Sequence, residues 1–147
     1  MFKRILVATD GSELSARAVD KAIALARVVG ADLFALKVVH LQAEAHWDGA
    51  LIQEHTAHAK REAQQTELAQ AVVDAVKESA QGTGIQVTSL TVKASSVADA
   101  VIEVAQKNAC DLIVMASHGR RGLARVLLGS ETQHVLTHTL IPVLVIR

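Results

Sequence analysis

The sequence has few of the residues that mark specialised classes of protein. Among 147 residues there are one cysteine, one proline, one tryptophan, two phenylalanines and no tyrosine. The single cysteine, Cys110, cannot form an internal disulfide, which fits a reducing compartment, and its place beside an apolar run favours a buried thiol over a reactive one. Because aromatic side chains are so scarce, we expect a core of Leu, Val, Ile and Ala.

Net charge and long apolar runs are absent as well. Fifteen Lys and Arg balance 15 Asp and Glu, so the chain lacks the overall positive field that attracts nucleic acid or an anionic membrane. No stretch approaches the roughly 18 apolar residues of a spanning helix, and the opening MFKRILVATD turns polar too early for a secretory signal. We therefore expect one cytoplasmic domain, residues 1–147, that binds neither nucleic acid nor membrane.

The chain does contain short apolar runs that alternate with longer stretches of helical period. This alternation is typical of repeated βα units around a mostly parallel sheet, so we predict an α/β fold. The predicted strands cover residues 5–8, 32–40, 85–92, 112–116 and 143–146. The predicted helices are one that Gly30 closes, one over 51–82, one that Ser96 caps and one over 130–138.

The second predicted helix is long. A continuous helix over 51–82 would run about 45 Å, more than the ~38 Å width expected of a compact domain of this size. We therefore expect its first third to be irregular or bent, after a surface loop over 41–50. Its apolar face is predicted to hold Leu68, Val72, Ala75 and Val76.

The polarity of the strands predicts their places in the sheet. Strands without polar alternation are normally covered on both faces, which places 5–8 and 112–116 at the centre, while the more polar third strand belongs at an edge. The last strand, Val143 to Ile146, is wholly apolar, and an exposed apolar edge invites pairing with another chain. We expect a homodimer through this strand, with cover by the domain's own helices as the alternative.

One segment, SHGRRGLARVLLGS over residues 117–130, holds three arginines, three glycines and no acid. Glycines after a strand let the backbone approach a ligand, and a helix N-terminus presents amide groups and a partial positive charge. Here Gly119 follows the fourth strand, and Gly129 precedes Ser130, which has capping-box spacing to Gln133. We predict a phosphate between these two turns. The nearby cations are Arg120, Arg121 and Arg125.

Three segments together resemble the universal stress protein family over essentially the whole chain. They are VATDGS after the first strand, MASHGRRGLARVLLGS after the fourth, and IPVLVIR at the end. The resemblance implies an open five-stranded sheet of order 3-2-1-4-5, like that of the adenine nucleotide alpha hydrolases, and dimers joined through the fifth strand. It also implies ATP, with Mg²⁺, as ligand of a cytoplasmic stress-response protein.

The ATP-binding branch of that family carries the pattern G-x2-G-x9-G-[ST]. Its positions here are Ala116, Gly119, Gly129 and Ser130, so the last three match and the first does not. The extra methyl of Ala116 would crowd a nucleotide if that backbone must come close to it.

The resemblance also implies the contacts to ATP. The set is Ala8, Thr9, Asp10, Val38, Met115, Ala116, His118, Gly119, Arg120, Gly129, Ser130, Glu131 and Thr132. The first three of these would lie at the ribose and phosphates, and Val38 would offer its backbone to adenine. Met115 and Ala116 would line the base and sugar, and the residues from His118 onward would surround the phosphates. The Glu131 carboxylate would repel phosphate unless it points elsewhere or holds Mg²⁺, so we expect its backbone amide to be the useful group.

Other polar residues have competing readings. Asp10 could be a base, a Mg²⁺ ligand or a ribose anchor, or could cap the following helix through the DGSE spacing; capping combined with ligand contact is our expectation. The pairs His55/His58 and His134/His138 have one-face helical spacing, but no carboxylate or cysteine framework accompanies them, so solvated histidines are favoured over zinc.

No set of nucleophile, base and orienting group stands out, so we expect binding with at most slow ATP hydrolysis. A nucleotide-dependent regulatory or interaction module is the leading hypothesis. A dimeric interaction module that binds no nucleotide is the alternative, and a nucleotidyl-transfer enzyme or hydrolase of similar architecture is a third.

Overall fold

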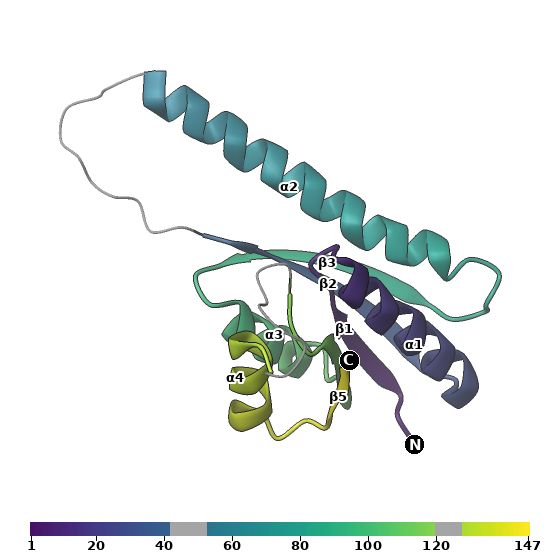
Figure 1. Ribbon diagram of the computed structural model, residues 1–147. Helices are drawn as coiled ribbons and strands as arrows, with labels where there is room; N and C mark the ends of the chain where they lie inside the picture. The colour runs from purple at the N-terminus through teal and green to yellow at the C-terminus, as the bar shows by residue number, and fades with distance from the viewer. Residues whose placement is uncertain (42–52, 120–127) are drawn as a thin grey trace.

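The computed structural model describes residues 1–41, 53–119 and 128–147. These residues form a parallel sheet of order β3-β2-β1-β4-β5 with helices on both faces (Figure 1). The elements in chain order are β1 (Arg4–Ala8), α1 (Glu13–Val29), β2 (Asp32–His40), α2 (Gln53–Ser79), β3 (Val87–Ala94), α3 (Val97–Lys107), β4 (Leu112–Ala116), α4 (Ser130–His138) and β5 (Val143–Ile146). The predicted α/β class and strand order are confirmed.

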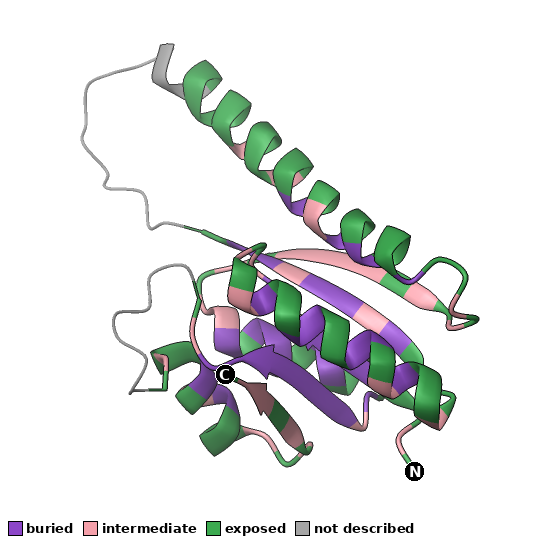
Figure 2. Cartoon of the chain, turned by 45° about the vertical axis from the view of Figure 1, so that its right-hand side comes forward, coloured by how far each residue is buried: buried purple, intermediate pink, exposed green. Residues whose placement is uncertain are grey.

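Two apolar cores lie on opposite faces of the sheet. Side chains alternate along each strand, so Ile5 and Val7 enter the core beneath α1 and α2, while Leu6 enters the core beneath α3 and α4. All five residues of β4 are buried, as expected of a central strand covered on both faces (Figure 2). The centre of the sheet is therefore a rigid base for the turns that leave it.

Local chemistry explains where the helices begin and end. Ser12 caps α1 by accepting the amide of Ser15, and Gly30 ends that helix in the left-handed conformation, with φ 69°. Ser96 caps α3, as predicted, by accepting the amide of Asp99. The observed β3 lies two residues later than predicted.

The helix α2 corrects two predictions. It is continuous over Gln53–Ser79 and extends beyond the sheet, whereas its first third was expected to be irregular or bent (Figure 1). The size argument failed because it assumed that the whole helix packs on the sheet, and residues 56–61 are all exposed (Figure 2). The buried stripe is Ala69, Val73, Val76 and Ala80, while the predicted core residues Leu68, at 61%, and Ala75 are exposed.

The outer strands also follow the polarity argument. The more polar β3 lies at one edge of the sheet, and β5 lies at the other, paired only with β4 among the described strands. The domain's own helices cover β5 in part, because Ile146 packs with the core under α1 and Val143 packs with the core under α3 and α4. Leu144 remains 38% exposed.

Cys110, two residues before β4, is a buried free thiol. Burial, followed by the nearby charge of Asp111, raises its pKa to about 11, so the thiolate form is disfavoured. The expectation of an unreactive thiol agrees with this environment. Within the described segments, no helix has the length and apolarity that a bilayer crossing needs.

Candidate functional site

The turn after β1 is held by a chain of hydroxyl groups. Thr9 is 8% exposed, and its Oγ1 accepts the amide of Gly11 at 3.2 Å and lies 3.0 Å from Ser15 Oγ. Ser15 Oγ in turn donates to the Ser12 carbonyl at 2.9 Å. These bonds fix the backbone where it leaves the sheet and enters α1.

Asp10 is part of this turn but does not cap α1. Its Oδ1 accepts the amide of Ser12 at 2.9 Å, and Ser12, not Asp10, is the N-cap. The prediction that Asp10 caps the helix through the DGSE spacing is therefore wrong, because the helix begins one residue after Ser12, at Glu13. The Asp10 carboxylate stays at the carboxyl end of β1.

The turn after β4 begins at Ser117, which is 5% exposed. Its amide donates to the carbonyl of Ile146 at 2.7 Å, and its carbonyl accepts the amide of Gly129 at 2.8 Å. Its Oγ lies 3.2 Å from Nδ1 of His118. Ser117 therefore joins the ends of β4 and β5 to the start of α4, and the arguments from sequence missed it.

Two glycines allow these turns to meet. A Cβ on Gly119 would lie 2.7 Å from Oδ2 of Asp10, and a Cβ on Gly129 would lie 3.2 Å from both the Ser117 carbonyl oxygen and the His118 Cα. The turns after β1 and β4 and the start of α4 are thus in close contact. We call residues 9–10, 117–119 and 129–132 the carboxyl-end cluster.

The start of α4 lacks the predicted capping box. Its N-cap is Gly129, which has no side chain to accept an amide, and Ser130 is the first helical residue. The Gln133 amide bonds to the Gly129 carbonyl at 2.9 Å, while the amides of residues 130–132 have no partner within the helix. Thr132 is 2% exposed and donates its hydroxyl to the Ala116 carbonyl at 3.0 Å, which anchors this turn to β4.

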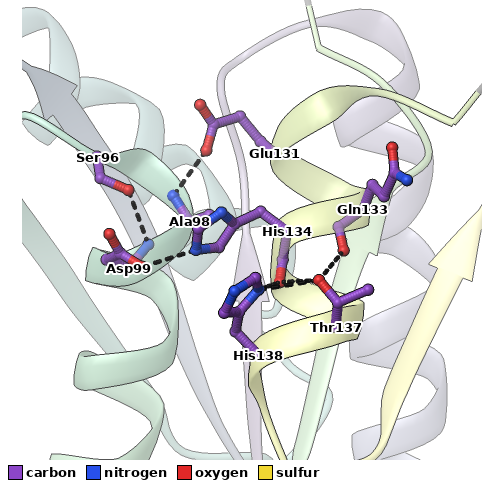
Figure 3. A network of polar contacts seen from close by, with 8 residues as sticks. All are labelled: Ser96, Ala98, Asp99, Glu131, Gln133, His134, Thr137 and His138. Atoms are coloured by element: carbon purple, nitrogen blue, oxygen red, sulfur yellow. Dashed lines mark hydrogen bonds and ion pairs between the residues drawn. The ribbon is translucent and has the colours of Figure 1, made fainter.

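Glu131 directs its carboxylate to another helix. Its Oε2 accepts the amide of Ala98, in the first turn of α3, at 2.8 Å (Figure 3). The side chain is thus engaged by protein, while its backbone amide is one of those at the start of α4. A role for the Glu131 amide in binding a ligand stays a prediction.

The residues expected near the base and sugar lie at the same end of the sheet. Val38 and Met115 are each 7% exposed and pack in the core under α3 and α4, where Ala8 is half-buried beside them. Ala116 is 8% exposed and belongs to the core under α1 and α2. The methyl that departs from the family pattern is therefore accommodated by the protein's own core.

The remaining predictions concern the arginines of the glycine-rich segment and the histidine pairs. Arg120, Arg121 and Arg125 lie outside the described residues, as does the side chain of His55. His134 and His138 stack with ring centroids 4.0 Å apart, and His134 Nε2 lies 2.8 Å from Asp99 Oδ1, so this pair is engaged within the protein and not merely solvated. In the described part of the chain, no three His, Cys, Asp or Glu side chains gather as a metal site built from protein side chains alone would require.

A family model for universal stress proteins matches residues 1–147. Universal stress protein MJ0531 of Methanocaldococcus jannaschii is 33% identical over 153 residues, covering 100% of this chain and 83% of the relative. Universal stress protein YxiE of Bacillus subtilis is 31% identical over 153 residues, covering 100% of both chains.

Solved structures show the same fold. The structure of MJ0577, from M. jannaschii, has a TM-score of 0.79 at 24% identity, covering 99% of this chain and 96% of that one. A universal stress protein in complex with cAMP has a TM-score of 0.71 at 24% identity, with 99% and 97% coverage. One from Archaeoglobus fulgidus in complex with dAMP has a TM-score of 0.63 at 18% identity, with 99% and 98% coverage. By its family match along its entire length and by its sheet order, this chain belongs to the universal stress protein family.

Proposed function

We propose that this protein binds an adenine nucleotide, ATP with Mg²⁺, at the carboxyl-end cluster, and acts in the cytoplasm as a nucleotide-dependent regulatory or interaction module of the stress response. The observation that carries the proposal is the close approach of the two glycine turns to Asp10 and to the start of α4. Backbone amides at a helix N-terminus favour a phosphate there, and Gly129 contributes no side chain to block it.

The cluster offers few charged side chains to a phosphate, so the amides of residues 130–132 are its principal donors. Ser130 is exposed, and His118 is half-buried with its Nδ1 next to Ser117. Protonated His118 adds a cation at this point. Binding through backbone amides suits an oligophosphate whose charge is spread over several oxygens.

The residues present fit a magnesium ion that arrives with the nucleotide. Mg²⁺ usually keeps several waters and binds through one or two carboxylates together with substrate phosphates. Asp10 is the carboxylate of the carboxyl-end cluster that faces Gly119, and it would hold the ion. When bound, Mg²⁺ would neutralise phosphate charge. The backbone amides of residues 130–132 would orient the phosphates, and Gly129 has no side chain that could block them.

The family's structural neighbours support an adenine nucleotide as ligand. Two proteins of the same fold have been solved with cAMP and with dAMP, which share the adenine base and at least one phosphate. The Ala116 methyl packs in the core under α1 and α2, so the missing first glycine of the pattern does not argue against such a ligand. Hydrolysis would be slow, because the sequence indicates no set of nucleophile, base and orienting group.

Equilibrium titration with Mg-ATP tests the proposal. Gly129→Val places bulk against the Ser117 carbonyl, and Ser130→Asp places a negative charge where phosphate would bind. Each should weaken binding by about tenfold or more, which corresponds to about 1.4 kcal/mol. Ser79→Asp adds the same charge at the far end of α2 and should leave the affinity unchanged. Binding that neither site variant alters would remove the carboxyl-end cluster from consideration.

A second candidate function is a dimeric interaction module that needs no nucleotide. It is favoured by β5, whose outer edge has no partner strand among the described residues and whose Leu144 is 38% exposed. The two candidates differ in whether nucleotide remains bound through purification, which mass spectrometry or absorbance would detect.

A further inference from the structure

The helices α3 and α4 are joined by two polar contacts near their N-terminal ends. Glu131 Oε2 accepts the Ala98 amide at 2.8 Å, and His134 Nε2 lies 2.8 Å from Asp99 Oδ1 (Figure 3). In both contacts a side chain of α4 reaches the first turn of α3. They lie one helical turn apart on α4, so together they fix both the place and the tilt of that helix.

The Glu131 carboxylate occupies a favourable position for a negative charge. Ser96 already satisfies the Asp99 amide, and Glu131 satisfies the Ala98 amide beside it. Amides at a helix N-terminus carry a partial positive charge, which stabilises a carboxylate placed on them. The charge of Glu131 is therefore bound at the start of α3, although its own backbone lies at the start of α4.

We propose that Glu131 is a positioning residue for the nucleotide site, holding the first turn of α4 against α3 and keeping its own negative charge away from the bound phosphates. This inference rests on the proposed function. It explains how an acid can follow Gly129 and Ser130 in a turn that is to receive an anion.

The hydrogen bond between Glu131 and the Ala98 amide, called the tether below, affects how well the start of α4 can bind phosphate. Hydrogen bonds from backbone amides span about 2.7–3.2 Å and weaken steeply when the angle at the hydrogen falls below ~120°, so the contacts to a phosphate depend on the tilt of residues 130–132. On its other side this turn is anchored by the Thr132 hydroxyl on the Ala116 carbonyl. Without the Glu131 contact, α4 is still held to α3 by His134 and Asp99, but its first turn is anchored only to β4 and can tilt away from α3.

Three substitutions separate the tether from the charge. Glu131→Gln keeps an oxygen that accepts the Ala98 amide but removes the charge, and Glu131→Ala removes both. Glu131→Asp keeps the charge on a side chain too short to reach Ala98; because Asp is favoured in a first helical turn, this variant is expected to fold. The exposed neighbour Gln133, changed to Ala, serves as the control on the same turn.

The experiment is calorimetric titration of each folded variant with Mg-ATP, and competition of adenosine against Mg-ATP. We expect Glu131→Gln and Gln133→Ala to bind Mg-ATP within about twofold of wild type, and Glu131→Ala to bind about fivefold more weakly than Glu131→Gln, the effect of one hydrogen bond. Glu131→Asp should be weakest, since its charge is released toward the phosphates. Adenosine, which has no phosphate, should compete equally well in all proteins that bind it.

The possible failures are distinguishable. If Glu131→Ala binds Mg-ATP as tightly as Glu131→Gln, the positioning role is overturned while the proposed function stands. Adenosine affinity that falls in parallel with ATP affinity would indicate a general loss of structure and would also overturn it. Wild-type protein that binds no nucleotide at all overturns both proposals.

Discussion

At the scale of single residues, the carboxyl-end cluster depends on two positions without a Cβ. Gly119 faces the Asp10 carboxylate and Gly129 faces the backbone of the preceding turn. Neither of them is needed for an unusual backbone angle, because the glycines with positive φ are found elsewhere, at positions such as Gly30. Their role is to allow close approach: a Cβ at Gly119 would require the Asp10 carboxylate to shift, and a Cβ at Gly129 would crowd the preceding turn.

Gly119→Ala should therefore destabilise the protein and weaken nucleotide binding together. The new methyl would lie 2.7 Å from Asp10 Oδ2, and Asp10 cannot retreat freely because its Oδ1 holds the Ser12 amide. Overpacking of this kind costs about 1–3 kcal/mol, which urea unfolding would measure. Gly30→Ala is the control: it meets nothing within 4 Å but has φ +69°, so it should lower stability by about 1 kcal/mol and leave Mg-ATP affinity unchanged.

Residue-level prediction from sequence succeeded where one pattern determines the contact. Ser96 was identified as a cap from its place before an apolar stripe, and the glycine spacing pointed to Gly119 and Gly129 as positions of close approach, while their role in ligand binding stays a prediction. Asp10 and Ser130 were misassigned as caps, because neighbouring Asp, Gly and Ser residues can each start a helix and only tertiary contacts decide among them. The Glu131 contact with Ala98 joins residues 33 positions apart, which no local pattern indicates.

At the scale of elements, the pair α3–α4 combines a capped start of α3 with a contact between Asp99 and His134. A hydrogen bond with Ser96 and, second, the contact with His134 hold the pKa of Asp99 below its ordinary value of 3.8. A carboxyl whose pKa is lower in the folded state stabilises that state above the ordinary pKa and ceases to do so as the pH falls through the folded-state value.

Asp99→Asn should accordingly lower the thermal midpoint at pH 7, and the difference from wild type should shrink once the pH falls below about 3.8. Both groups are exposed, so added salt should reduce the difference as well. Calorimetry across this pH range measures it. Asp74→Asn, on the outer face of α2, is the matched control; a difference that persists unchanged into acid would contradict this account.

The sequence predicted most elements because each has a strong local period. The bounds of β2, β4 and β5 agree with the expected strands, since apolar runs end where polar or glycine residues begin. The helix α2 was harder, because its alanine-rich stretch offers two overlapping apolar faces. Contact with β2 and β3 selects the face of Val73 and leaves Leu68 exposed, which periodicity alone cannot decide.

At the scale of the whole molecule, the two edge strands of the sheet, β3 and β5, differ in the polarity of their side chains. The polar β3 edge needs no cover, whereas β5 is apolar and pairs on one side only among the described strands. Apolarity placed β1 and β4 in the centre, but the full strand order came from the family resemblance, because local patterns do not specify which buried strands are neighbours.

Dimerisation through β5 can be tested with one substitution. The carbonyls of Pro142 and Ile146 accept bonds from β4, so by alternation the backbone N–H of Val145 points away from the sheet. Val145→Pro removes this outward donor, and proline is tolerated at an edge strand. Light scattering should show a dimer for wild type and for the control Val145→Ala, and a monomer for Val145→Pro with an unchanged circular dichroism spectrum. A monomeric wild type would exclude this mode of assembly.

Ser117 forms hydrogen bonds both to the proposed nucleotide site, at Gly129, and to the proposed dimer edge, at Ile146. Its carbonyl accepts the Gly129 amide and its own amide donates to the Ile146 carbonyl, so we expect a displacement of the start of α4 by an incoming phosphate to move the last residue of β5 as well. A signal about nucleotide supply would then reach the assembly surface through a single peptide unit, without a hinge, a lid or a rearrangement of the core.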